Sequence, residues 1–132
     1  MLTRAAIVLC LRGLTARNDL VLRLFGNDVR PDFEENFFTQ PNFLGYSPIP
    51  LDPARWREVQ NEGEPAIVYP QQIFRSTSPQ PPENVYGYYV SCGDVIVGGH
   101  RFSDGPYKVE NNGHQIKIDL QIGGSDNDDG DE

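Results

Sequence analysis

Short apolar runs, separated by the turn-forming residues glycine and proline, constrain this chain most. Thirteen glycines and eleven prolines make up 24 of its 132 residues, about 18%, where average usage is roughly 12%. Both residue types weaken the interior of a helix or strand. A long helical bundle is therefore disfavoured, and many short strands joined by turns fit the pattern better.

The C-terminal part of the body shows this pattern most clearly. The segment Asn111-Asn112-Gly113 separates residues 107–110 from residues 115–122, and Asn-Gly supplies the two positive φ angles of a type I′ turn. Side chains alternate between the two faces of a strand, so the second run places one set of apolar residues on a single face: Ile116, Ile118, Leu120 and Ile122. We therefore expect a β-hairpin here.

Other segments favour further short strands. Leu20, Leu22 and Leu24 alternate within residues 20–25, and Pro70 in residues 66–76 indicates an edge or a bulge. The remaining candidate strands are residues 43–51, 85–91, 95–97 and 100–102. Six to eight short strands with long connections predict an all-β fold, an antiparallel β-sandwich or jelly roll preceded by a short N-terminal helix.

Residues 3–14 predict that helix, with Thr3 as its N-cap and Gly13 at its exit. It is apolar on most faces from Ala5 to Leu11, so it is either buried in its own domain or docked on a neighbour. A strand over residues 7–11 is the competing interpretation, because Ile and Val are β-branched. The segment imitates a signal peptide, but Arg12 ends its short apolar run and we do not expect secretion.

The predicted organisation is a helical arm (residues 1–18), a β-sandwich domain (19–122) and a disordered acidic tail (123–132). The net charge is −8, and the last ten residues hold five of the nineteen acids and no base. An acidic chain lacks the basic stripe that nucleic acids or anionic membranes require. The tail does not follow the spacing of a calcium-binding loop, so we interpret it as solubilising.

Few residues of the chain are candidates for catalysis or metal binding. The cysteines and histidines stand singly at Cys10, Cys92, His100 and His114, without the paired spacing of a zinc site or a disulfide framework. His100 lies four residues before Asp104, and this pair is the one weak indication of an enzyme. No nucleophile or nucleotide motif occurs. We therefore predict no catalytic residues, no cofactor and no metal.

Several motifs follow one another in an order that carries more information than any one of them. LVLRLFGNDVRP (residues 20–31) precedes FLGYSPIPLDPARW (43–56), AIVYPQQIFRST (66–77), VYGYYVS (85–91) and GHRFSDGPYKVENNGHQIKIDLQI (99–122). This order, over most of residues 4–122, resembles a group of small structural proteins of tailed phages, of the marine and cyanobacterial type. The acidic tail and the proline-rich segment 78–82 depart from the pattern.

The resemblance implies a virion role with no catalytic residues to carry over. We expect a capsid decoration, or cement, protein on the capsid surface, which binds the major capsid protein or other virion proteins and forms a dimer or trimer. Apolar residues of the helix, of the Phe-rich loop 27–43 and of the tyrosine-rich strand are the candidate interface: Ile7, Val8, Leu11, Phe33, Phe37, Phe38 and Tyr89. The alternative is a tail or head fibre module that binds host-surface carbohydrate through exposed tyrosines.

Overall fold

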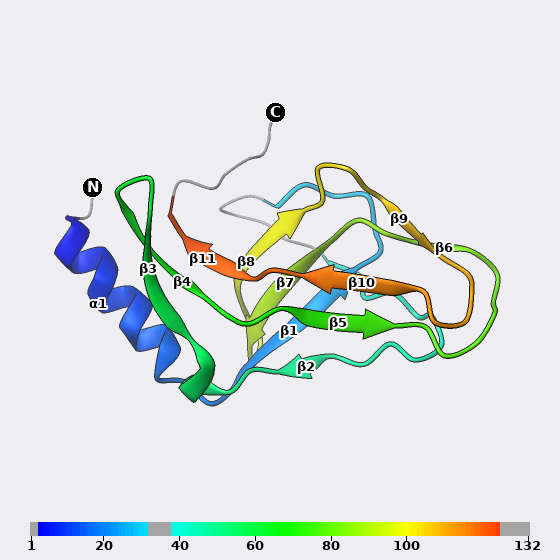
Figure 1. The fold of residues 1–132 in the computed structure, drawn as a ribbon, viewed down its shortest axis with the longest axis horizontal. Coiled ribbons are helices and arrows are strands. Elements are labelled where there is room, and N and C mark those ends of the chain that lie inside the picture. The colour runs from blue at the N-terminus through cyan, green and yellow to red at the C-terminus, as the bar shows by residue number, and fades with distance from the viewer. Residues whose placement is uncertain (1–2, 32–37, 125–132) are drawn as a thin grey trace.

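The computed structural model describes residues 3–31 and 38–124. It confirms an antiparallel all-β fold with one short N-terminal helix (Figure 1). The elements, in chain order, are α1 (Arg4–Thr15), β1 (Leu20–Phe25), β2 (Ile49–Pro50), the 3-10 turn η1 (Pro53–Arg55), β3 (Arg57–Asn61), β4 (Glu64–Val68), β5 (Gln72–Arg75), β6 (Glu83–Val85), β7 (Gly87–Cys92), β8 (Val95–Arg101), β9 (Tyr107–Val109), β10 (Gln115–Ile118) and β11 (Gln121–Gly123).

The largest sheet has the strand order β2-β1-β7-β8, and all its pairs are antiparallel. The predicted alternation in β1 is confirmed, because Leu20, Leu22 and Leu24 are buried toward the core. Strands β7 and β8 are adjacent in the chain and form a hairpin. Its register shifts where Val90 pairs with Gly98 but Ser91 pairs with Ile96, so Val97 is the extra residue of a β-bulge in β8.

The opposite layer consists of the sheets β11-β4-β3 and β10-β5. The expected strand 66–76 is divided at Pro70 into β4 and β5, as its proline indicated. Three residues lie between β4 and β5, but only two lie between their partners β10 and β11. Tyr69 N–H donates to Leu120 O across this break at 3.1 Å, so the two chain segments remain hydrogen-bonded between the two sheets. Residues of both layers, such as Leu22 and Phe74, meet in one hydrophobic core.

The hairpin expected at residues 107–122 is wrong in its pairing. Strand β9 pairs with β6, and β10 pairs with β5. The turn is present, since His114 N–H donates to Asn111 O at 3.1 Å, but only Gly113 has a positive φ, as in a type II rather than a type I′ turn. Gly113 N–H donates to Ser76 O at 2.8 Å, which ties the turn to the end of β5. Pairing partners are non-local, so local turn chemistry did not determine them.

Two further expectations need correction. The candidate strand 43–51 is reduced to β2, because Phe43 turns into the core and Gly45 takes a φ of 97°. The candidate strand 85–91 is interrupted between β6 and β7, where Tyr86 N–H donates to Phe25 O. In the described part of the chain, no helix has the length and apolar character that a membrane crossing requires.

Candidate protein-contact surface

Helix α1 begins as its sequence predicts, and its side chains divide into two sets. The Thr3 hydroxyl oxygen accepts a hydrogen bond from Ala6 N–H at 3.1 Å, which caps the first turn. The helix continues beyond the expected exit at Gly13 to Thr15. Leu11 is buried in the core, and Ile7 and Leu14 pack against the same core. This spacing of three and four residues is the inward face of a helix.

Four uncharged residues on the opposite side of α1, here called the helix face, are Ala5, Leu9, Cys10 and Gly13, and the exposed Arg12, three residues from Leu9, borders them. All four residues are exposed, and 69% of Leu9 is accessible to solvent. None of these side chains carries a charge. An ordinary surface helix is polar on its solvent side. The helix face is therefore an apolar surface that no described part of the chain covers.

An ion pair fixes the helix against the sheet. Arg12 donates to Glu58 on β3 through Nε at 2.7 Å and through Nη2 at 3.1 Å. This hydrogen bond lowers the pKa of the Glu58 carboxyl and raises the pKa of Arg12. Both side chains remain about half exposed, so water screens the attraction between them. The apolar contact of Leu11 is therefore the main attachment of α1.

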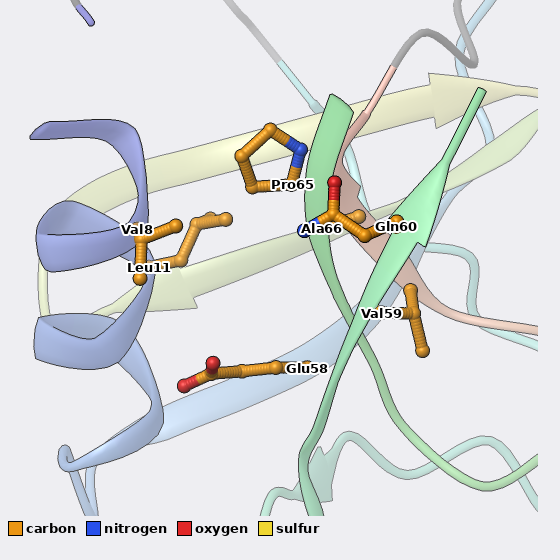
Figure 2. A pocket seen from close by; sticks show the side chains of 7 residues that line it. All are labelled: Val8, Leu11, Glu58, Val59, Gln60, Pro65 and Ala66. Carbon is orange, nitrogen blue, oxygen red and sulfur yellow. The ribbon is translucent and has the colours of Figure 1, made fainter. Parts of the chain in front are cut away.

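A pocket of about 280 Å³ opens beside the helix, between α1 and the hairpin of β3 and β4 (Figure 2). Its one charged lining side chain is Glu58, which Arg12 already holds. The rest of the lining is apolar or uncharged: Val8, Leu11, Val59, Gln60, Pro65 and Ala66. This volume and lining suit an apolar side chain of another protein better than they suit a reacting group.

The helical residues predicted as contact residues lie mostly inward. Ile7 and Leu11 serve the chain's own core, and Val8 is half-buried at the pocket. Leu9, which was not among the predicted residues, is the large apolar side chain that faces outward. The helical period could have found it, because Ile7, Leu11 and Leu14 on one face leave Leu9 on the other.

The aromatic residues predicted as contacts pack on one another. The Phe38 ring stacks on Tyr89 with their centroids 4.5 Å apart, and its centroid lies 4.6 Å from that of Phe25. Tyr89 is only 6% exposed, and burial raises the pKa of its hydroxyl. Phe33 and Phe37 lie outside the described residues. The described aromatic residues of this region thus cover their own sheet.

None of the six tyrosines is fully exposed. Tyr46 illustrates their use within the fold, since its hydroxyl donates to Gln40 Oε1 at 2.5 Å and accepts from Leu24 N–H at 3.2 Å. Burial raises the pKa of Tyr46 to about 12. A sugar-binding platform needs a ring face that is open to solvent. The tyrosine rings instead fill the interior and its rim.

The candidate pair His100 and Asp104 is not a hydrogen-bonded pair. The Asp104 carboxylate accepts from the Tyr107 hydroxyl at 2.5 Å, and burial together with this bond raises the pKa of Tyr107 to about 12. The His100 ring lies beside Tyr88, with their centroids 5.5 Å apart. Within residues 3–31 and 38–124, no cluster of three or more His, Cys, Asp or Glu side chains is arranged to hold a metal ion.

The two cysteines lie in different environments. Cys10 is exposed on the helix face, and Cys92 is half-buried with its thiol 3.3 Å from Asp19 Oδ2. Asp19 also accepts two hydrogen bonds from Arg17, which lower the pKa of its carboxyl to about 2. These contacts connect the chain that follows α1 to β7, so we interpret them as structural.

No protein-family model matches the chain, and no curated protein or solved structure matches it either.

Proposed function

We propose that this protein is a structural component of a phage virion, a decoration protein that attaches to the capsid surface without catalysing a reaction. The order of its sequence motifs supports the phage context. The helix face supports attachment by protein–protein contact, because Leu9 is exposed on a helix whose other side packs against the core through Leu11. Exposure of Leu9 is the observation that carries the proposal.

Leu9 and the pocket beside α1 are two places, on different sides of the helix, where a partner could make contact. Leu9 offers a side chain to a partner, and the pocket lined by Val8 and Leu11 can receive one. A small contact of this kind becomes effective when many copies bind one lattice, because each attachment restrains its neighbours. The capsid surface, as a repeating lattice, offers this arrangement.

The carbohydrate-binding alternative has less support. It depended on tyrosine rings at the surface, and Tyr69, Tyr88 and Tyr89 are buried. Trp56, the single tryptophan, is also only 9% exposed. We therefore favour protein contact through the helix face over sugar binding.

Capsid sedimentation tests the proposal. Purified protein is mixed with expanded tailed-phage capsids that lack their decoration protein, and the bound fraction is measured after centrifugation through sucrose. We expect the unmodified chain to bind, and Leu9→Glu to weaken binding by ~10-fold or more, since it puts a charge where the proposed contact would bury a leucine. Glutamate is as good a helix former as leucine, so α1 should persist.

Leu44→Glu is the matched control. Leu44 is also large, apolar and 52% exposed, but it lies outside α1. Its substitution should leave capsid binding unchanged. The proposal fails if the unmodified chain does not bind capsids, or if the two variants bind equally well.

A further inference from the structure

The turn between β9 and β10 carries a chemically reactive dipeptide at an exposed position. Asn112 is the one asparagine of the sequence that a glycine follows, and both Asn112 and Gly113 are exposed. The turn lies at the end of the molecule opposite α1 (Figure 1). Glycine has no Cβ to shield its backbone nitrogen, and a Cβ built at Gly113 meets no atom within 4 Å. The space that a reaction within this dipeptide needs is therefore open.

The reaction in question is the loss of the asparagine amide, and asparagine is among the thermolabile residues. The Gly113 nitrogen attacks Cγ of Asn112, and the side-chain amide leaves as ammonia with the proton that the nitrogen gives up. The product is a five-membered imide between the two residues. Water then adds to one of the two imide carbonyl carbons. Addition at Cγ gives aspartate, and addition at the main-chain carbon gives isoaspartate, whose main chain runs through Cβ and Cγ.

Hydrogen bonds restrain the attacking nitrogen in the folded chain. Gly113 N–H donates to Ser76 O at 2.8 Å, and Ser76 is 0% exposed, so water does not replace this bond. Ser76 N–H donates to His114 O at 2.9 Å, which continues the pairing of β5 with β10 into the turn. His114 N–H donates to Asn111 O at 3.1 Å and fixes the turn itself. The attack on Asn112 therefore requires the turn to open from the end of β5.

We propose that Asn112 is a modification site of this protein, converted by water to aspartate and isoaspartate through an imide with Gly113, at a rate set by how often the turn opens from Ser76. Isoaspartate lengthens the main chain of the turn by one methylene, so Gly113 no longer aligns with Ser76. Either product adds a negative charge two residues from Glu110. The modification goes beyond the proposed capsid attachment, which uses α1.

Peptide mapping by mass spectrometry of the aged full chain tests the site. The purified protein is kept at mildly alkaline pH, and the conversion of amide to acid is followed at each asparagine. We expect Asn112 to react first. Asn111 is the internal control, because it is exposed in the same turn but is followed by an asparagine, whose side chain hinders the attack. Conversion at Asn111 should be slower.

The same measurement in urea tests the restraint. Urea unfolds the chain and releases Gly113 N–H from Ser76 O. Conversion at Asn112 should therefore be faster by ~10-fold or more than in the folded chain at the same pH and temperature, as expected for the loss of a buried hydrogen bond.

Asn112→Gln is the matched variant. Asn112 is exposed and has no positive φ, so the turn should accept glutamine. Glutamine keeps the amide, but its longer side chain has to close a six-membered ring, which forms more slowly. The variant should accumulate little of the acidic species.

Three results would overturn the proposal. One is an asparagine of the folded chain that reacts before Asn112. Another is an Asn112→Gln variant that accumulates acid as fast as the unmodified chain, and the third is a rate at Asn112 that urea leaves unchanged. None of these results depends on capsid binding, so the two proposals can fail separately.

Discussion

Two apolar parts of the molecule lie outside the main β-sandwich and differ in how they pack. One is helix α1, and the other is the chain at Phe38 and Thr39, here called the Phe38 segment. Phe38 stacks on Tyr89 and Phe25, and the chain around it is tied down where Gly26 N–H donates to Thr39 O at 2.7 Å. The helix turns Leu11 inward but leaves Leu9 exposed. The Phe38 segment therefore completes the fold, whereas helix α1 leaves apolar surface exposed.

An apolar sequence does not by itself identify a contact surface. From their composition, both segments were predicted to contact another protein. Only the structure distinguishes them. The Phe38 ring has two other rings within 5 Å and is packed, whereas Leu9, on the outer side of the helix, has no such contacts and is exposed.

Removal of the stacked ring should have the largest effect. Phe38→Ala uncovers Phe25 and Tyr89, which are 0% and 6% exposed in the intact fold. We expect it to lower the free energy of unfolding by ~2–4 kcal/mol, which urea denaturation measures. If the loss were below ~0.5 kcal/mol, as for an ordinary surface substitution, Phe38 would belong with Leu9 and the comparison would fail.

Truncation within α1 should separate its two faces. Leu11→Ala should cost ~2–3 kcal/mol in the free energy of unfolding, because Leu11 is 7% exposed and joins the core. Leu9→Ala should change the same quantity by no more than ~0.5 kcal/mol. Equal losses in the two variants would contradict the assignment of inner and outer faces.

Extremes of pH should have the smallest effects. Acid should loosen α1, and alkali should loosen the Phe38 segment. The pKa values of Glu58 and Asp19 are lowered by their arginine partners, to about 2 for Asp19. Their stabilisation is present above the ordinary carboxyl pKa and is lost as the pH falls through the lowered values. Acid should therefore loosen α1 first.

Alkali should loosen the Phe38 segment and the other buried tyrosine contacts. Burial raises the pKa of Tyr89, and raises that of Tyr46 to about 12. Their stabilisation is complete below the ordinary tyrosine pKa, near 10, and is lost as the pH rises through the raised values. Hydrogen exchange followed by mass spectrometry at each pH, corrected for intrinsic rates, measures both effects. Loosening of α1 in alkali before the Phe38 segment would contradict this order.

Local patterns in the sequence predicted what depends on neighbouring residues. The Thr3 cap, the alternation of Leu20, Leu22 and Leu24, and the break at Pro70 all follow from such rules. The hairpin at Asn111-Asn112-Gly113 was mispredicted because β9 and β10 each pair with a strand distant in sequence.

The candidate site was harder to predict for the same reason. The helical period already indicates Leu9, but only the packing of α1 against β4 shows which face is outward. The arrangement of the pocket residues Glu58 and Pro65 depends on the strand order. Strand order is set by the competition of all apolar segments for one core, and no short motif encodes it.

Cys10 permits the most direct test of the helix face. It is exposed beside Leu9, whereas Cys92 is half-buried on β7 and serves as an internal reference. The rate at which a maleimide modifies each thiol can be measured by mass spectrometry, with the protein free and bound to capsids. We expect bound capsid to slow modification of Cys10 by ~10-fold or more and to leave the rate at Cys92 unchanged. An unchanged rate at Cys10 in the bound protein would contradict the proposal that α1 contacts the capsid.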